Sequence, residues 1–99
     1  MPLKSGFGGT VTLYRFGELR ILSLKNITGI TSTDATICDL QATDAPLGSM
    51  AAIPVSGFSG SNWATFMLIV LSSSPGPRVN CHGAPGAINT ADYTLTWLV

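Results

Sequence analysis

The feature that most constrains this chain is a short apolar segment, WATFMLIVL at residues 63–71, which ends in six consecutive large apolar residues and carries no charge. It is too short to cross a bilayer as a helix, which needs about 20 residues. Stretches rich in serine, glycine and proline flank it on both sides, at residues 56–62 and 72–77. A short apolar run between turn signals is typical of a strand that is covered on both faces. We therefore predict a strand at residues 63–71, and its second face needs a cover of its own.

The rest of the chain contains shorter segments that are rich in β-branched and aromatic residues or that alternate between apolar and polar residues, as strands do. Gly17 and Glu18 separate the first two, and Gly-X between two strands predicts a hairpin with a type II′ turn. Segment 47–55 fits either one helical turn from Met50 or an edge strand that contains Pro54. The other predicted strands are residues 10–16, 19–24, 35–40, 78–82 and 91–99. The predicted loops are residues 26–34, 41–46, 56–62 and 83–89.

These elements amount to seven or eight short strands with turn signals between them, and no segment shows a sustained helical period. The pattern is typical of an antiparallel sandwich or barrel. We expect an all-β fold, a small antiparallel, jelly-roll-like β-sandwich that residues 10–99 form as a single domain. Residues 1–9 include glycines at positions 6, 8 and 9 and are predicted to be a flexible linker or an N-terminal arm.

The composition points to association with other molecules of protein. Charged residues make up only 10% of the 99 residues, and the formal net charge is zero. A typical soluble domain has about 25% charged residues, and low charge protects a monomer poorly against association. We expect a surface rich in Ser, Thr, Asn and Gly, a surface partly buried between subunits, or both. The five Lys and Arg residues argue against a nucleic-acid partner, because phosphate binding needs clustered cations.

The chain begins with MPLK followed by a glycine-rich stretch, not by the apolar core of a signal peptide. We therefore expect either synthesis in the cytoplasm without export by that route or a fragment of a longer protein with an added start, and in both cases no membrane insertion. Cys38 and Cys81 permit one disulfide. The alternative, two buried free thiols, is favoured because free cysteine behaves as a small buried hydrophobe.

No catalytic set is predicted, and the protein is expected not to be an enzyme. The one histidine, His82, follows Cys81, and neighbours on a strand point to opposite faces, so they form no local Cys–His pair. Spacings typical of metal ligands are missing, so neither a metal nor a cofactor is expected. The acidic residues lie at predicted loops or strand ends and are expected on the solvated surface. They are Glu18, Asp34, Asp39, Asp44 and Asp92.

A carbohydrate-binding site is the better-supported prediction, because sugar recognition combines a flat apolar ring with side chains that donate and accept hydrogen bonds. Trp63 follows Asn62 at a loop–strand junction, where one ring face could be open. A polar set on the strand 78–82 alternates onto one face. The predicted carbohydrate-binding residues are Asn62, Trp63, Arg78, Asn80 and His82. The alternatives are that Trp63 packs in the core or between subunits and that the polar set is only a solvated face.

The strand 63–71 also predicts a subunit interface. The inner face of a sandwich accounts for Phe66, Leu68 and Val70 or for the alternate set, but not for both, and an exposed apolar strand face promotes aggregation. A neighbouring subunit is the expected cover for the second set, and either assignment of the two faces fits the pattern. Trp97, within the last strand, is expected in the core or in this contact. The predicted interface residues are Met67, Ile69, Leu71 and Trp97.

The order of motifs resembles the small β-sandwich head domains at the C-terminal end of bacteriophage tail-fibre and receptor-binding proteins. The likeness covers nearly the whole chain. Its parts are Gly-Thr-Val and Arg-Phe-Gly-Glu at residues 9–11 and 15–18, the strand 37–40 leading to Pro46, the strands 66–71 and 78–82 around Pro-Gly at 75–76, and the closing strand at 92–95. The family usually has Gly-Tyr-Arg-Pro where this chain has Thr-Asp-Ala-Pro at residues 43–46, so no receptor contact of that loop is carried over.

This resemblance implies a homotrimer whose N-terminal segment leads back to a fibre. It implies a noncatalytic adhesin at the tail tip of a virion, which attaches the virion to a saccharide of the host cell surface and contacts other tail or baseplate proteins. The alternative is a structural virion module, such as a decoration, collar or baseplate protein, that binds only other virion proteins.

Overall fold

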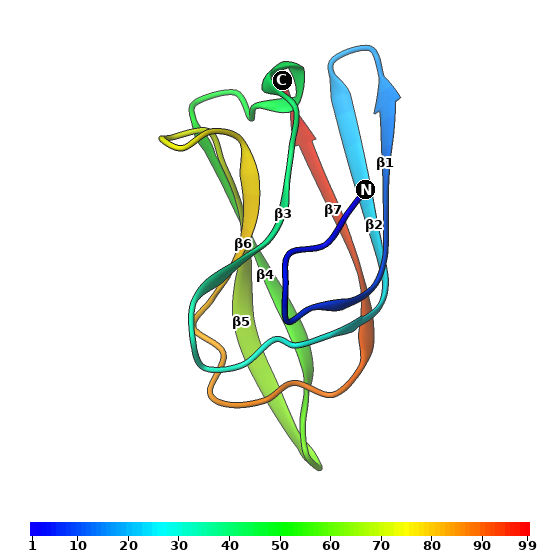
Figure 1. The fold of residues 1–99 in the computed structure, drawn as a ribbon, viewed down its shortest axis with the longest axis vertical. Coiled ribbons are helices and arrows are strands. Elements are labelled where there is room, and N and C mark those ends of the chain that lie inside the picture. Colours follow the sequence, from blue (N-terminus) through cyan, green and yellow to red (C-terminus); the bar gives the residue numbers. More distant parts are fainter.

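The structure, a computed structural model, describes residues 1–99. Seven strands and one short 3-10 helix make up the regular structure (Figure 1). The strands are β1 (Gly8–Phe16), β2 (Leu19–Thr28), β3 (Ala35–Asp39), β4 (Met50–Ser59), β5 (Asn62–Leu71), β6 (Arg78–His82) and β7 (Ala91–Leu98). The 3-10 helix, η1 (Ala42–Asp44), lies in the connection from β3 to β4.

The strands form two antiparallel sheets that pack face to face. One sheet has three strands in the order β1-β2-β7, and the other has four in the order β3-β6-β5-β4. The pairs β2–β7, β3–β6 and β4–β5 are nested along the chain, as if one long hairpin were folded over on itself. This arrangement confirms the predicted all-β sandwich and its seven or eight strands.

Alternation along the strands builds the core between the sheets. In β5, Phe66, Leu68 and Val70 are buried, whereas their neighbours Met67, Ile69 and Leu71 lie half-buried on the outer face. In β7, Tyr93, Leu95 and Trp97 point into the same core. Trp97 is 5% exposed, so of its two expected positions it takes the one in the core of the protomer, and its place among the predicted interface residues is corrected. Its position follows from parity, because residues two apart on a strand share a face.

Both cysteines are buried in this core as free thiols, as the sequence favoured. Burial raises the pKa of the Cys38 thiol to about 11. Burial also raises the pKa of Cys81. Thiolates are the reactive form of cysteine, so both side chains act as small apolar groups that β3 and β6 contribute to the core.

The hairpin at Gly17 and Glu18 is confirmed. Phe16 pairs with Leu19 across a two-residue turn, and Gly17 has a φ of +60°. A positive φ at the first turn residue alone is the requirement of the type II′ turn. Within segment 47–55, residues 50–55 belong to the edge strand β4, which is where Pro54 can lack an N–H donor without breaking a ladder.

Two predicted loops are partly strand. β2 continues past residue 24 to Thr28. A β-bulge at Asn26, which has a φ of +54°, leaves the polar residues Lys25 and Asn26 out of the regular pairing with β7, so that the Ile27 side chain again points into the core. β4 extends to Ser59, so Phe58, predicted in a loop, is a strand residue. Local polarity suggested loops in both places, but pairing with the neighbouring strand decides where a strand ends.

The N-terminal segment is packed against the sandwich. The Lys4 N–H donates to the carbonyl of Ile37 at 2.8 Å, and Phe7 contacts the core. Gly9 lies in β1, and a Cβ added there would come within 2.6 Å of the Lys25 carbonyl at the β2 bulge. Gly9 therefore allows a close approach of two backbones, whereas the sequence suggested flexibility.

Candidate functional site

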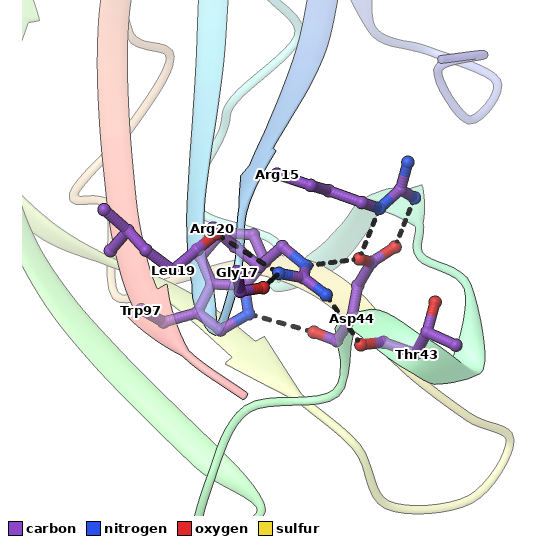
Figure 2. A network of polar contacts seen from close by, with 7 residues as sticks. All are labelled: Arg15, Gly17, Leu19, Arg20, Thr43, Asp44 and Trp97. Carbon is purple, nitrogen blue, oxygen red and sulfur yellow. Dashed lines mark hydrogen bonds and ion pairs between the residues drawn. The ribbon is translucent and has the colours of Figure 1, made fainter.

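The one buried carboxylate belongs to Asp44, which is completely inaccessible to solvent and is held by two arginines (Figure 2). Arg15 binds it with Nε at 2.8 Å from Oδ1 and Nη2 at 2.7 Å from Oδ2. Arg20 donates from Nε to Oδ1 at 2.7 Å and from Nη1 to the Gly17 carbonyl at 2.6 Å. The indole Nε1–H of Trp97 donates to the Asp44 carbonyl at 2.9 Å.

This network stabilises the fold. Hydrogen bonds from Arg15, and then from Arg20, hold the pKa of Asp44 below its usual range, so the carboxylate is ionised at neutral pH and has no proton to supply as a general acid. The network of Arg15, Arg20, Asp44 and Trp97 joins the β1–β2 hairpin to η1 and β7. The prediction that Asp44 lies on the solvated surface is wrong. A signal was present in the sequence, because Arg20 alternates onto the same face as Leu22, and a buried charge needs a partner.

The exposed aspartates each pair with one basic side chain. Lys4 lies 2.6 Å from Asp39, and Lys25 lies 3.6 Å from Asp92. Asp34 accepts the Gly83 N–H at 3.1 Å and lies 2.5 Å from the His82 ring, and these bonds lower the pKa of Asp34. Nowhere in the chain do three or more His, Cys, Asp or Glu side chains gather closely enough to hold a metal ion.

The outer face of the four-stranded sheet carries most of both predicted sets. The register across β4, β5 and β6 forms three rows. They are Met50–Leu71–Arg78, Ala52–Ile69–Asn80 and Pro54–Met67–His82. Each row therefore sets an apolar pair from β4 and β5 beside a polar residue of β6. The predicted interface and most of the predicted carbohydrate site are neighbours on one surface.

The polar residues of β6 already have partners within the protomer. Arg78 donates from Nη1 to the carbonyls of Ser73 at 2.7 Å and Gly76 at 2.9 Å, which ties down the turn after β5. The Thr36 hydroxyl donates to Asn80 Oδ1 at 2.7 Å. Together with the His82–Asp34 pair, these contacts give each polar side chain of β6 on this face a hydrogen-bond partner within the protomer.

Trp63 lies elsewhere, at the tip of the β4–β5 hairpin, which projects at one end of the long axis (Figure 1). The Trp63 side chain is 73% exposed, and one face of its ring stacks on Phe58, with centroids 4.0 Å apart and an interplanar angle of 30°. Phe58 is its partner across the strands, and Gly60 and Ser61 form the turn between them. Ser56 and Thr65, both exposed, form the next pair on the same face.

The predicted five-residue site is therefore divided. Trp63 is four residues from Met67 along β5, or about 13 Å at the rise of a strand, so it lies far from the row that contains His82. Asn62 precedes Trp63 and so points to the opposite face of the hairpin. The residues that do accompany Trp63 are Phe58, Ser56 and Thr65. Sequence reasoning missed them because the Gly-Ser turn at residues 60–61 was not recognised as a hairpin turn.

No protein-family model, curated protein or solved structure matches this chain. The fold and the site together define a small seven-stranded β-sandwich that presents an aromatic pair at the end of a projecting hairpin. None of the helical structure is long and apolar enough to cross a membrane.

Proposed function

We propose that this chain is a noncatalytic receptor-binding domain that acts as a homotrimer at the tip of a phage tail and attaches the virion to a saccharide on the host cell surface. The observation that carries the proposal is the Trp63 ring, 73% exposed, with its rear face held by Phe58. Burial of apolar surface stabilises a fold by about 25 cal/mol for each Å² removed from water, and an exposed indole does not contribute this free energy. Such an exposed ring at the end of a paired hairpin supports a binding role.

The neighbouring residues suit a sugar. Ser56 and Thr65 lie directly opposite each other beside the aromatic pair, and each hydroxyl can both donate and accept a hydrogen bond. Stacking on an apolar ring combined with such hydroxyls matches a saccharide, whose rings have apolar faces and polar rims. The strands supply the spacing, because cross-strand pairs keep neighbouring side chains within about 5.5 Å.

The far end of the same face supplies the proposed subunit contact. Met67, Ile69 and Leu71 form an apolar strip with Met50, which is 56% exposed, and Pro54. The strip begins at Met67, about 13 Å from Trp63 along β5, and ends at Leu71, about 27 Å from it. A neighbouring subunit that covers the strip leaves the hairpin tip free, so assembly and saccharide binding do not compete for the same residues.

We predict that Trp63→Ala weakens binding to host-surface glycans about tenfold or more, because truncating a central aromatic anchor costs more than about 1.4 kcal/mol. Binding is measured by titration against the glycans that the native protein retains on an array. Phe16→Ala is the matched control, since Phe16 is an aromatic side chain 60% exposed on the other sheet. Equal binding by native protein and Trp63→Ala would remove Trp63 from the site.

We expect size-exclusion chromatography with light scattering to give three times the mass of the 10.3 kDa chain at micromolar concentration. The physical reason is the uncovered apolar strip in a protein with only 10% charged residues. A clean monomer at that concentration would contradict the trimer.

A structural virion module is the second candidate, favoured by a separate apolar patch on the three-stranded sheet. Phe16, Leu19 and Leu98 form one row there, and Tyr14 lies beside it. Tyr14, Phe16 and Leu98 are 48%, 60% and 54% exposed. This candidate predicts attachment to virion proteins with no glycan binding and no adsorption to host cells.

A further inference from the structure

The hairpin tip that carries Trp63 and the loop beside it contain no ionisable side chain. Residues 56–65 and 83–90 consist of apolar residues, Gly, Pro, Ser, Thr and Asn. The two segments lie together, because the Asn89 N–H donates to the Phe58 carbonyl at 2.7 Å and the Asn89 side chain donates to the Gly60 carbonyl at 2.7 Å. The candidate site is therefore built from uncharged groups on both sides.

Every lysine and arginine of the chain already contacts a carboxylate or a backbone carbonyl. Lys4 and Lys25 pair with aspartates, and Arg15 and Arg20 are bound to Asp44. Arg78 holds its own turn beside Leu71, about 27 Å from Trp63 along β5. A charge at that distance is beyond the screening length of about 8 Å at physiological ionic strength. None of these five basic side chains belongs to the two segments that form the candidate site, so the site has no cation of its own to offer a sulfate, phosphate or carboxylate group.

The nearest titratable side chain on the same face is His82, two rows from Trp63 and across one strand. It is in contact with Asp34, which lies 2.5 Å from its ring. A protonated His82 therefore forms a neutral pair with Asp34, and a neutral His82 leaves one carboxylate that would repel an acidic sugar. Neither state provides an attraction for an anionic ligand.

We infer that the saccharide recognised at the Phe58–Trp63 platform is neutral, so that the domain selects uncharged glycans over acidic ones. This inference rests on the proposed function. Recognition then comes from stacking on the indole and from hydrogen bonds to Ser56 and Thr65, which are groups that salt screens little. Binding should be insensitive to ionic strength, in contrast to a site that reads charge.

The test compares probes that share a backbone. The native protein is applied to an array that carries neutral glycans beside acidic ones, including dextran beside dextran sulfate and fully methyl-esterified polygalacturonate beside polygalacturonate. Retained glycans are then titrated at about 20 mM and about 500 mM NaCl, between which the screening of surface electrostatics changes from weak to strong. We expect neutral glycans to bind, with dissociation constants that change less than about twofold between the two salt concentrations. Acidic counterparts are expected to bind at least tenfold more weakly.

Two variants separate the outcomes. Trp63→Ala should lose the neutral glycans, and Thr65→Lys, which adds a cation beside the ring at an exposed position, should gain salt-sensitive binding to acidic glycans. Binding of the native protein to acidic glycans that falls tenfold or more with salt and depends on Trp63 overturns the neutral class while leaving the proposed adhesin standing. Binding of no glycan above the level of Trp63→Ala overturns the adhesin itself.

Discussion

Replacing Asp44 by asparagine is expected to lower the free energy of unfolding by about 3 to 5 kcal/mol, the usual cost of breaking a buried ion pair by removing one partner. The amide leaves Arg20, which is 7% exposed, without a counterion in the core. A domain of this size has about 5 to 15 kcal/mol in total, so the loss is a large fraction of its stability. The midpoint of thermal unfolding should fall by about 12 °C or more.

Thermal and urea unfolding followed by circular dichroism measure this effect. The matched control replaces all three members together, Arg15→Met, Arg20→Met and Asp44→Leu, because an apolar substitute of similar volume leaves no charge uncompensated. The triple variant should be more stable than Asp44→Asn despite carrying more changes. An Asp44→Asn protein that unfolds within about 1 kcal/mol of the native protein would show that the network contributes little.

The same carboxylate predicts a pH dependence. The arginines lower the pKa of Asp44 in the folded state, so the unfolded state binds a proton more readily. The stabilisation is fully present above the unfolded pKa of about 3.9 and is lost as the pH falls through the lower folded value. The native protein should therefore lose stability below about pH 4 more steeply than Asp44→Asn does. Parallel slopes for the two proteins would assign acid unfolding to other groups.

Aspartate substitutions at two adjacent positions of β5 are expected to have different effects, loss of folding at one position and loss of assembly at the other. Leu68→Asp places a charge at a side chain that is completely buried between the sheets, so the variant should not fold. The cost combines about 1.5 to 3 kcal/mol of lost apolar burial with several kcal/mol for an unpaired buried ion. Ile69→Asp points to the outer face, where the protomer leaves it half-buried, and should fold but fail to assemble.

Circular dichroism reports the fold of each variant, and light scattering reports its mass. Ile69→Asn is the control for charge, because it removes the same apolar side chain from the strip without adding a carboxylate. We expect folded monomer for Ile69→Asp and a weakened oligomer for Ile69→Asn. Two aspartate variants that both remain folded and oligomeric would contradict the face assignment and the proposed interface together.

The sequence by itself determined the strands and most of the turns, because these depend on residues close together in the chain. The alternation of β7 and the apolar run of β5 specify which side chains share a face. The Gly17–Glu18 turn specifies a two-residue hairpin, and Pro54 excludes a central strand. These features predicted a sandwich in which one face of the strand 63–71 is buried. They left open whether that face is Phe66, Leu68 and Val70 or the alternate set.

Only the tertiary structure decided what meets across the fold. Asp44 binds Arg15, which is 29 residues away in the chain, and Arg20, which is 24 residues away. No local sequence pattern encodes a partner at such a separation. The same is true of Trp63, which register places beside Phe58 and far from His82, although the sequence grouped it with the polar residues of β6. Alternation gives each side chain a face, but strand pairing alone determines its neighbours on that face, because register depends on where distant turns place the strand ends.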